Sequence, residues 1–129
     1  MSRSQQASRY GRLAEEHAAR KFGFDLDHRE VRGVRVDARD SDGRPWDVKA
    51  AMENRKNGPG RFRLWRDQHR VLEREGGGYV FVRYVAREGG ISVRESRAVP
   101  AESVRVDWGG SGSHRRGSDQ AKVLARSVF

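Results

Sequence analysis

Apolar side chains recur along this chain with two different periods, and these periods predict its helices and strands. Over residues 8–22 they fall at four-residue steps, which is the spacing of one helix face, and they are Tyr10, Ala14, Ala18 and Phe22. Gly23 follows as a C-terminal cap. A second helix is predicted over residues 66–75, where a run of three glycines ends it.

Segments with the two-residue period of strands lie between and after these helices. The predicted strands cover residues 25–31, 33–40, 44–52, 61–64, 79–85 and 91–99. The fourth fits a short edge strand, and the almost continuously apolar fifth is typical of a central, buried strand. On the last, Ile91, Val93 and Glu95 are expected on one face. This alternation of helices and strands predicts an α/β domain with a mixed central sheet flanked by helices.

Composition changes near Gly109, after which Gly, Ser and basic residues dominate. We therefore expect a compact domain over residues 1–108 and a flexible, basic C-terminal tail over residues 109–129, which can hold a short helix over residues 119–128.

The chain has 129 residues and 27 Lys and Arg against 18 Asp and Glu, a formal charge of +9. This surplus favours a polyanionic partner such as nucleic acid, although it also fits a solubilising surface. No Cys is present, which excludes disulfides and thiolate metal sites. Residues 1–6 lack the apolar core of a signal peptide, and no apolar run reaches membrane-spanning length. We expect an intracellular, cytoplasmic protein without a membrane partner.

Candidate chemistry lies on the two strands around the turn Asp40–Gly43. Residues two apart on a strand share a face, so Asp47 and Lys49 point the same way. If the two strands pair as a hairpin, Asp37 lies near both. Two carboxylates and an amine would then converge, which suits a hard divalent cation and an activated water. An exposed cross-strand salt-bridge cluster is the alternative.

A further carboxylate comes from the first helix. Its apolar stripe through Ala7 and Tyr10 leaves Glu15 at the stripe's edge, whereas Glu16 points to the opposite side. Glu15 can therefore reach the sheet edge and Glu16 should be solvated. The alternative is that both are surface charges.

The segments that carry this chemistry resemble the PD-(D/E)xK nuclease superfamily, whose core is restriction-endonuclease-like. They are Gly11-Arg-Leu-Ala-Glu15, Val36-Asp37 and Asp47-Val48-Lys49, and the resemblance spans roughly residues 8–86. Within the superfamily, the chain is most similar to archaeal-type Holliday junction resolvases and their viral relatives. It departs from the pattern with Val36 in place of Pro and Asp47 in place of the commoner Glu.

The resemblance implies a metal-dependent phosphodiesterase of DNA recombination and repair, usually a homodimer acting on branched DNA, from an archaeon or an archaeal virus. We expect Mg²⁺, with Mn²⁺ as a substitute, bound by Asp37 and Asp47 and by Glu15 directly or through water. Lys49 would orient or deprotonate the nucleophile or stabilise the phosphate. The resemblance adds the Val48 carbonyl as a ligand and Gln68 to position water or phosphate.

Basic residues cluster around the polar loop and the second helix, and we expect them to bind the DNA backbone: Arg55, Lys56, Arg61, Arg63 and Arg66. A solvated patch is the alternative. The four histidines have no zinc spacing, and His69 is expected to be a solvated helix residue or a DNA contact. Trp46 and Trp65 are expected in the core or a dimer interface. Segment Gln120–Val123 with Val128 and Phe129 is faintly similar to a sliding-clamp-binding peptide, although its spacing departs from that motif.

Three functions remain open on the sequence. The first is a structure-selective endonuclease, and the second is a repair, restriction or transposon-type nuclease of the same superfamily. The third is a non-catalytic nucleic-acid-binding module, against which the intact set of Asp37, Asp47 and Lys49 argues. The small size, which leaves no room for a sequence-reading domain, favours recognition of branched DNA.

Overall fold

The computed structural model describes residues 3–53, 60–108, 120–124 and 127–129, without the side chains of residues 3–7 and 124. Its helices are α1 (Arg3–Phe22) and α2 (Arg66–Arg74), followed by a short 3-10 turn η1 (Ala101–Ser103). Its strands are β1 (Asp25–Val31), β2 (Val34–Arg39), β3 (Pro45–Met52), β4 (Arg61–Trp65), β5 (Gly78–Arg87), β6 (Gly90–Pro100) and β7 (Gln120–Leu124).

Five strands form one mixed sheet in the order β1-β2-β3-β5-β6. β3 and β5 run parallel, and the other neighbours are antiparallel. The predicted fold class is therefore confirmed, including the buried position of β5 between two partners. Its side chains from Tyr79 to Val82 are fully buried because the sheet is covered on both faces.

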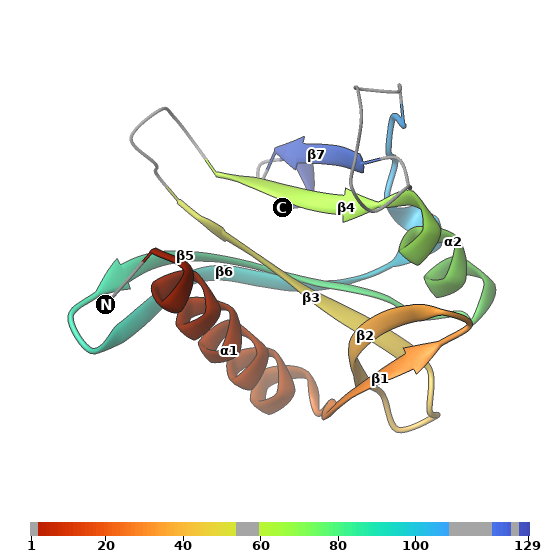
Figure 1. Cartoon of the computed structure of the whole chain (residues 1–129), viewed down its shortest axis with the longest axis horizontal. Coiled ribbons are helices and arrows are strands. Elements are labelled where there is room, and N and C mark those ends of the chain that lie inside the picture. The colour runs from red at the N-terminus through yellow and green to blue at the C-terminus, as the bar shows by residue number, and fades with distance from the viewer. Residues whose placement is uncertain (1–2, 54–59, 109–119, 125–126) are drawn as a thin grey trace.

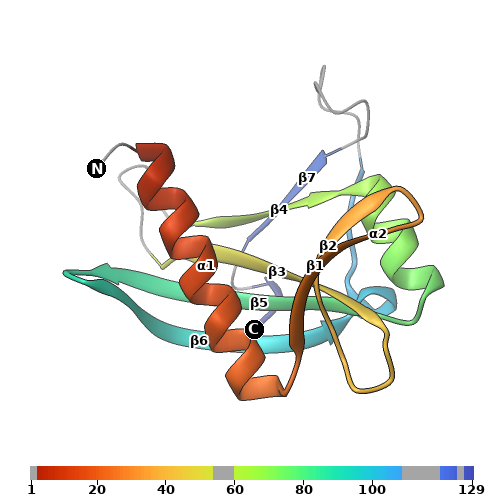
Figure 2. The same cartoon turned by 60° about the horizontal axis from the view of Figure 1, so that its bottom comes forward.

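The two faces of the sheet have different covers (Figure 1). Helix α1 lies across one face, where Ala14 and Ala18 pack against Val80 and Val82 of β5. The other face is covered by α2 and by the pair β4 and β7, which contribute Phe62, Leu64 and Leu72 to the larger core cluster. Figure 2 shows the same three layers from a second side.

The expected C-terminal helix is wrong, because the chain forms strand β7 there. β7 pairs antiparallel with β4, from Gln120 opposite Trp65 to Leu124 opposite Arg61. Ala121 is buried and Lys122 exposed, which is the two-residue period of a strand. Val128 is buried in the larger core cluster. The partner strand is some sixty residues away in the sequence, so local pattern could not reveal it. Residues 109–119 lie outside the described ones, and the division at residue 108 stays a prediction.

The expectation that Glu95 shares a face of β6 with Ile91 and Val93 is also wrong. A bulge at Arg94 shifts the register between β5 and β6, so that Arg83 lies opposite Glu95 but Tyr84 lies opposite Val93. Val93 packs towards α1, whereas Glu95 forms an ion pair with Arg83. An extra residue reverses the side of every later side chain, and alternation alone cannot show it.

The hairpin of β2 and β3 positions the candidate chemistry. Its turn is built by Asp40, whose Oδ1 accepts hydrogen bonds from the backbone N–H groups of Asp42 and Arg44. Beyond the turn only two residue pairs are in register, Arg39 with Pro45 and Ala38 with Trp46. The strands then separate, and the next residues along them are Asp37 and Asp47.

Within the described residues, neither helix has the length and apolar character needed to cross a lipid bilayer. The intracellular location stays a prediction.

Candidate active site

Asp37 and Asp47 link β2 and β3 by hydrogen bonds at the place where the two strands separate. The backbone N–H of Asp37 donates to Oδ1 of Asp47 at 3.1 Å, and the N–H of Val48 donates to Oδ2 of Asp37 at 2.8 Å. The two carboxylates thus accept the hydrogen bonds that backbone carbonyls accept in a regular strand pair. As predicted from the hairpin, the two side chains lie close together. Each side chain belongs to its own strand but is fixed by the backbone of the other.

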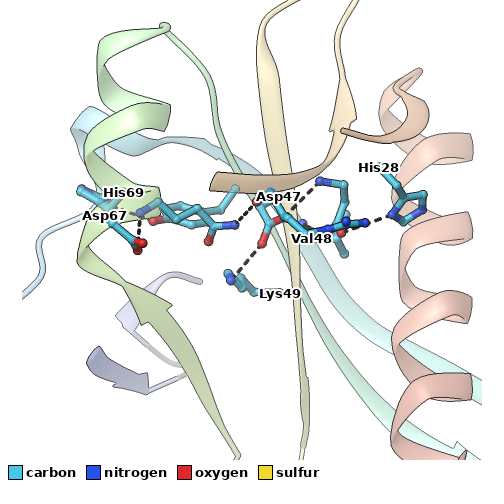
Figure 3. A network of polar contacts seen from close by, with 10 residues as sticks. His28, Asp47, Val48, Lys49, Asp67 and His69 are labelled. Carbon is cyan, nitrogen blue, oxygen red and sulfur yellow. Dashed lines mark hydrogen bonds and ion pairs between the residues drawn. The ribbon is translucent and has the colours of Figure 1, made fainter. Parts of the chain in front are cut away.

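Lys49 lies on the same face of β3 as Asp47. Its Nζ is 2.9 Å from Oδ2 of Asp47, and both side chains are largely buried, with exposed fractions of 15% and 8%. Figure 3 shows these residues in a polar network that runs from Asp67 and His69 on α2, through β3, to His28 beside α1. The sequence-predicted convergence of Asp37, Asp47 and Lys49 is present in this geometry.

Glu15 reaches the same network from α1, as the helix geometry predicts. Its carboxylate is 19% exposed and Oε1 lies 2.9 Å from Nε2 of His28. Glu16 is exposed. Burial raises the pKa of Glu15, an effect that the nearby His28 opposes and Asp47 reinforces.

The crowding of carboxylates changes their protonation. Burial, followed by the Asp47 carboxylate, raises the pKa of Asp37 from 3.8 to about 8, and the hydrogen bond from Val48 opposes this rise. Two like charges in a site sheltered from water favour a bound proton or a bound cation. A strongly perturbed group of this kind marks a candidate functional site.

Gln68 lies near the start of α2 and is buried, with 4% of its surface exposed. Its Nε2 donates to the carbonyl of Arg35 on β2 at 2.7 Å, which ties α2 to the strand that carries Asp37. Its Oε1 is buried and accepts no hydrogen bond from the described residues. A buried amide oxygen of this kind requires a donor such as water.

His69 is not a solvated helix residue, and that expectation is wrong. It is 5% exposed, its Nδ1 lies 2.7 Å from the hydroxyl of Tyr79, and its ring stacks on the Tyr79 ring. Trp108 meets the same ring edge-on. Burial lowers the pKa of His69. The helical pattern missed this position because the polar partner, Tyr79, comes from β5.

His28 joins the site without having been predicted. One ligand atom each from Glu15, His28 and Asp37 lies within 4.8 Å of the others. Zinc-type spacing along the sequence gives no sign of this group, since its members come from α1, β1 and β2. The available signal is the break in alternation over residues 27–30, where four polar residues follow one another in the middle of a strand.

The basic residues predicted to bind DNA are only partly placed. Arg61 and Arg63 lie on the exposed side of β4, alternating with buried Phe62 and Leu64. Arg66 is half-buried at the start of α2. Arg55 and Lys56 lie outside the described residues. Of the predicted aromatic residues, Trp46 is half-buried and packs in the core beneath α1, and its Nε1 donates to Asp40.

The donor set fits a divalent cation. Carboxylate oxygens from three elements converge, and at least two of their side chains are sheltered from water by the surrounding helix and strands. Hard divalent cations prefer such oxygens, and the cation offsets the repulsion between Asp37 and Asp47. Within this set, Asp47 already accepts from Lys49 and from the Asp37 backbone, so its remaining lone pairs are the ones left for an ion.

Comparison with known proteins agrees with this geometry. The family model described as "PD-(D/E)XK nuclease superfamily domain" matches residues 1–129. No curated protein and no solved structure gives a significant match to the chain. Because the family model spans the whole sequence and the fold is a mixed sheet flanked by helices, the chain belongs to the PD-(D/E)XK nuclease superfamily.

Proposed function

We propose that the chain is a divalent-metal-dependent endonuclease that cuts branched DNA, in the manner of archaeal-type Holliday junction resolvases. One observation carries the proposal: Asp37, Asp47 and Lys49 converge where β2 and β3 separate, and Glu15 reaches the same place from α1. Asp37, Asp47 and Glu15 would hold Mg²⁺ or Mn²⁺, with the Val48 carbonyl as a further ligand. The bound ion would lower the pKa of a water molecule and stabilise charge on a phosphoryl oxygen.

The remaining side chains have distinct roles in this proposal. Asp47 holds the Lys49 ammonium beside the carboxylates, where it can donate a hydrogen bond to a phosphate oxygen or orient the attacking water. Oε1 of Gln68, near the start of α2, has no donor among the residues that the structure describes, so it can receive a hydrogen bond from that water. Because Gln68 is tied to the carbonyl of Arg35, its amide is held in one orientation.

Charge supports DNA as the substrate. The formal charge of +9 supplies affinity for phosphates that does not depend on sequence. Arg61 and Arg63 form part of an exposed basic surface on β4. Because such contacts to phosphates do not read a base sequence, we propose that the DNA is recognised by its shape.

Two alternative functions would use the same site or the same basic surface. A repair, restriction or transposon-type nuclease would use the same site on another DNA, and a binding module would hold DNA without cutting it. We do not propose binding to a sliding clamp, because the residues of that motif pair in β7 and Val128 packs in the core.

The proposal is tested with labelled four-way junction, duplex, flap and single-stranded DNA, each incubated with Mg²⁺, Mn²⁺ or EDTA. We expect metal-dependent cleavage of the junction and little cleavage of the linear duplex. Equal cleavage of every duplex would instead support the repair or restriction alternative. Binding without cleavage in either metal would support the non-catalytic module.

Variants separate chemistry from binding. Asp47→Asn keeps an acceptor oxygen for the Asp37 N–H but removes charge, so cleavage should fall by at least about 100-fold while junction binding persists. Lys49→Ala should remove most of the activity without removing metal binding. Cleavage at the wild-type rate in Asp47→Asn would contradict the assignment of the site.

A further inference from the structure

Strand β1 has a bulge at the place where it passes the site. Leu26 pairs with Ala38 and Arg29 pairs with Val36, so Asp27 and His28 together oppose the single residue Asp37. A bulge inserts one residue and redirects the side chains around it, and bulges are frequent next to functional sites. Here the inserted residue brings an imidazole alongside the Asp37 carboxylate.

The backbone of His28 is strained. Its φ is +43°, in the left-handed region that glycine adopts most easily. Among the described residues only Arg32 is another non-glycine with positive φ, and its value of +49° is explained by the tight turn that it forms with Gly33 between β1 and β2. His28 lies inside a strand, at the bulge, where a residue with positive φ is usually glycine. A strained residue that persists beside a cluster of carboxylates suggests a functional reason.

In this backbone conformation the imidazole of His28 lies between two carboxyl groups. Nε2 of His28 lies 2.9 Å from Oε1 of Glu15, and Nδ1 lies 3.7 Å from Oδ1 of Asp37. Both ring nitrogens therefore face carboxylate oxygens. A neutral imidazole has only one N–H, so it can donate to only one of the two oxygens, and its other ring nitrogen directs a lone pair towards a carboxyl oxygen. A cation shared among these three side chains removes this conflict.

An ion pair with a protonated imidazole is the simpler interpretation of these contacts. It accounts for the two distances, but His28 is 48% exposed and an exposed ion pair contributes little stability. Such a contribution gives no reason to hold a non-glycine residue at positive φ. One ligand atom from each of Glu15, His28 and Asp37 already lies within 4.8 Å of the others, which is the compactness that a shared ion needs.

We propose that His28 is a nitrogen ligand of the divalent ion, and that this ligand shifts the preference of the site from Mg²⁺ towards Mn²⁺. The inference rests on the proposed function, since it concerns the ion that the nuclease would use. Mg²⁺ favours oxygen ligands and binds imidazole poorly, whereas nitrogen ligands are better suited to transition metals. An oxygen-only site on the same scaffold would lack this discrimination.

The test measures Mn²⁺ binding to metal-free protein in the absence of DNA. Pulsed electron paramagnetic resonance detects the coupling of bound Mn²⁺ to an imidazole nitrogen, and calorimetry gives the dissociation constants for Mn²⁺ and Mg²⁺. The variant is His28→Gly, because glycine accepts positive φ and leaves the bulge intact. His17→Ala controls for loss of any histidine, since His17 contacts Ser96 on β6 and not the carboxylates. Arg32→Gly controls for relief of positive φ elsewhere.

We expect the nitrogen coupling in the wild type, in His17→Ala and in Arg32→Gly, and its loss in His28→Gly. Mn²⁺ binding should weaken about tenfold in His28→Gly and Mg²⁺ binding clearly less. The melting temperature of His28→Gly in EDTA should be equal to or above that of the wild type, because strain is relieved. A lower melting temperature would mean that His28 is held for stability, and would overturn the inference.

The outcomes also separate this inference from the proposed function. Bound Mn²⁺ without nitrogen coupling, or coupling that persists in His28→Gly, would overturn the role of His28 and leave the metal-dependent nuclease intact. Absence of Mn²⁺ and Mg²⁺ binding in the wild type would overturn both. Equal weakening of Mn²⁺ and Mg²⁺ binding in His28→Gly would contradict the proposed metal preference.

Discussion

At the scale of single residues, Asp37 and Asp47 have a structural role beside the proposed chemical one. Each carboxylate accepts a hydrogen bond from a backbone N–H of the neighbouring strand, where the ladder of β2 and β3 ends. Removing either acceptor would leave a sheltered N–H unpaired, at a cost of about 1–3 kcal/mol. Substitution by Asn keeps an acceptor and removes the charge. Asn variants therefore report on chemistry with the least effect on the fold.

The two adjacent acids of α1 should differ in function. Glu15 faces the carboxylate cluster and Glu16 faces solvent. Glu15→Gln should lower the cleavage rate at least about tenfold, because a ligand or a water-holding charge is lost, whereas Glu16→Gln should stay within about twofold of the wild type. Cleavage assays at saturating metal compare the two variants directly. The assignment of the helix face fails if Glu16→Gln is the more damaging change.

The raised pKa of Asp37 predicts a dependence of stability on pH. Because the folded state holds this proton over a pH range in which the unfolded chain has lost it, its contribution to stability is lost as pH rises from about 4 towards 8. In EDTA, Asp37→Asn removes this titration. The variant should therefore gain stability relative to the wild type between pH 5 and pH 8, by an amount on the order of 2 kcal/mol.

Thermal denaturation in EDTA at the two pH values measures this gain. Adding Mn²⁺ should raise the melting temperature of the wild type more at pH 8 than at pH 5, because the ion competes with the proton for the same carboxylates. Asp42→Asn is the matched control, since Asp42 lies on an exposed turn of the same hairpin. A difference between Asp37→Asn and wild type that does not change with pH would contradict the raised pKa.

The sequence predicted those site residues whose positions follow from a regular period. Asp47 and Lys49 share a face because they are two apart on a strand, and Glu15 faces the sheet because of its angle on α1. His28 could not be found in this way, because an irregularity in β1 directs it. The expectation for His69 failed because Tyr79, its partner, lies on another element.

At the scale of elements, β7 illustrates where local pattern is insufficient. Its residues contain no strong strand signal, and pairing with β4 decides their conformation. The segment after it carries Val128, which is buried, and Phe129, whose ring centroid lies 6.2 Å from that of Phe62. The C-terminal residues thus complete the core on the side of the sheet that carries Asp47.

Removing the two C-terminal residues, Val128 and Phe129, should destabilise the protein. A chain that ends at Ser127 loses the apolar contacts of Val128 and Phe129, and the unfolding free energy should fall by roughly 2–4 kcal/mol. Lys122→Ala, on the exposed side of β7, should change it by less than about 0.5 kcal/mol. Chemical denaturation measures both. A shortened chain as stable as the full chain would mean that the C-terminus adds nothing to the core.

The boundaries of the remaining elements were close to those predicted, except that α1 begins at Arg3, five residues before the predicted start. The order of the strands within the sheet was not predicted. Propensity and glycine positions gave both helices and six strands, because each signal is local. A Cβ at Gly77 would overlap the carbonyl oxygen of Pro45, so this glycine allows α2 to end directly against β3. Contacts of this kind, like the bulges in β1 and β6, depend on the partner strand.

At the scale of the whole molecule, the described residues contain one group of three side chains close enough to share a metal ion, Glu15, His28 and Asp37. A four-way junction has two-fold symmetry, and resolving it requires two cuts at related positions. A symmetric dimer places two identical sites in that relation. The sequence offers apolar side chains for such an interface at Trp65, Trp108 and the strand of Ile91. Trp108 packs against the larger core cluster and Ile91 packs beneath α1. Both lie partly exposed, and Ile91 belongs to β6, an edge strand of the larger sheet.

We therefore expect a homodimer in solution at micromolar concentration, with about twice the chain mass of 14.7 kDa. Light scattering measures this mass with and without junction DNA, and mapping of the cut positions shows whether they are symmetric. Asp47→Asn serves as the control, since it should dimerise and bind without cutting. A particle that stays at the mass of one chain on the junction would favour a monomeric nicking nuclease, because a single site can cut only one strand in each encounter. A dimer that cuts the junction at symmetric positions and spares linear duplex would support the resolvase.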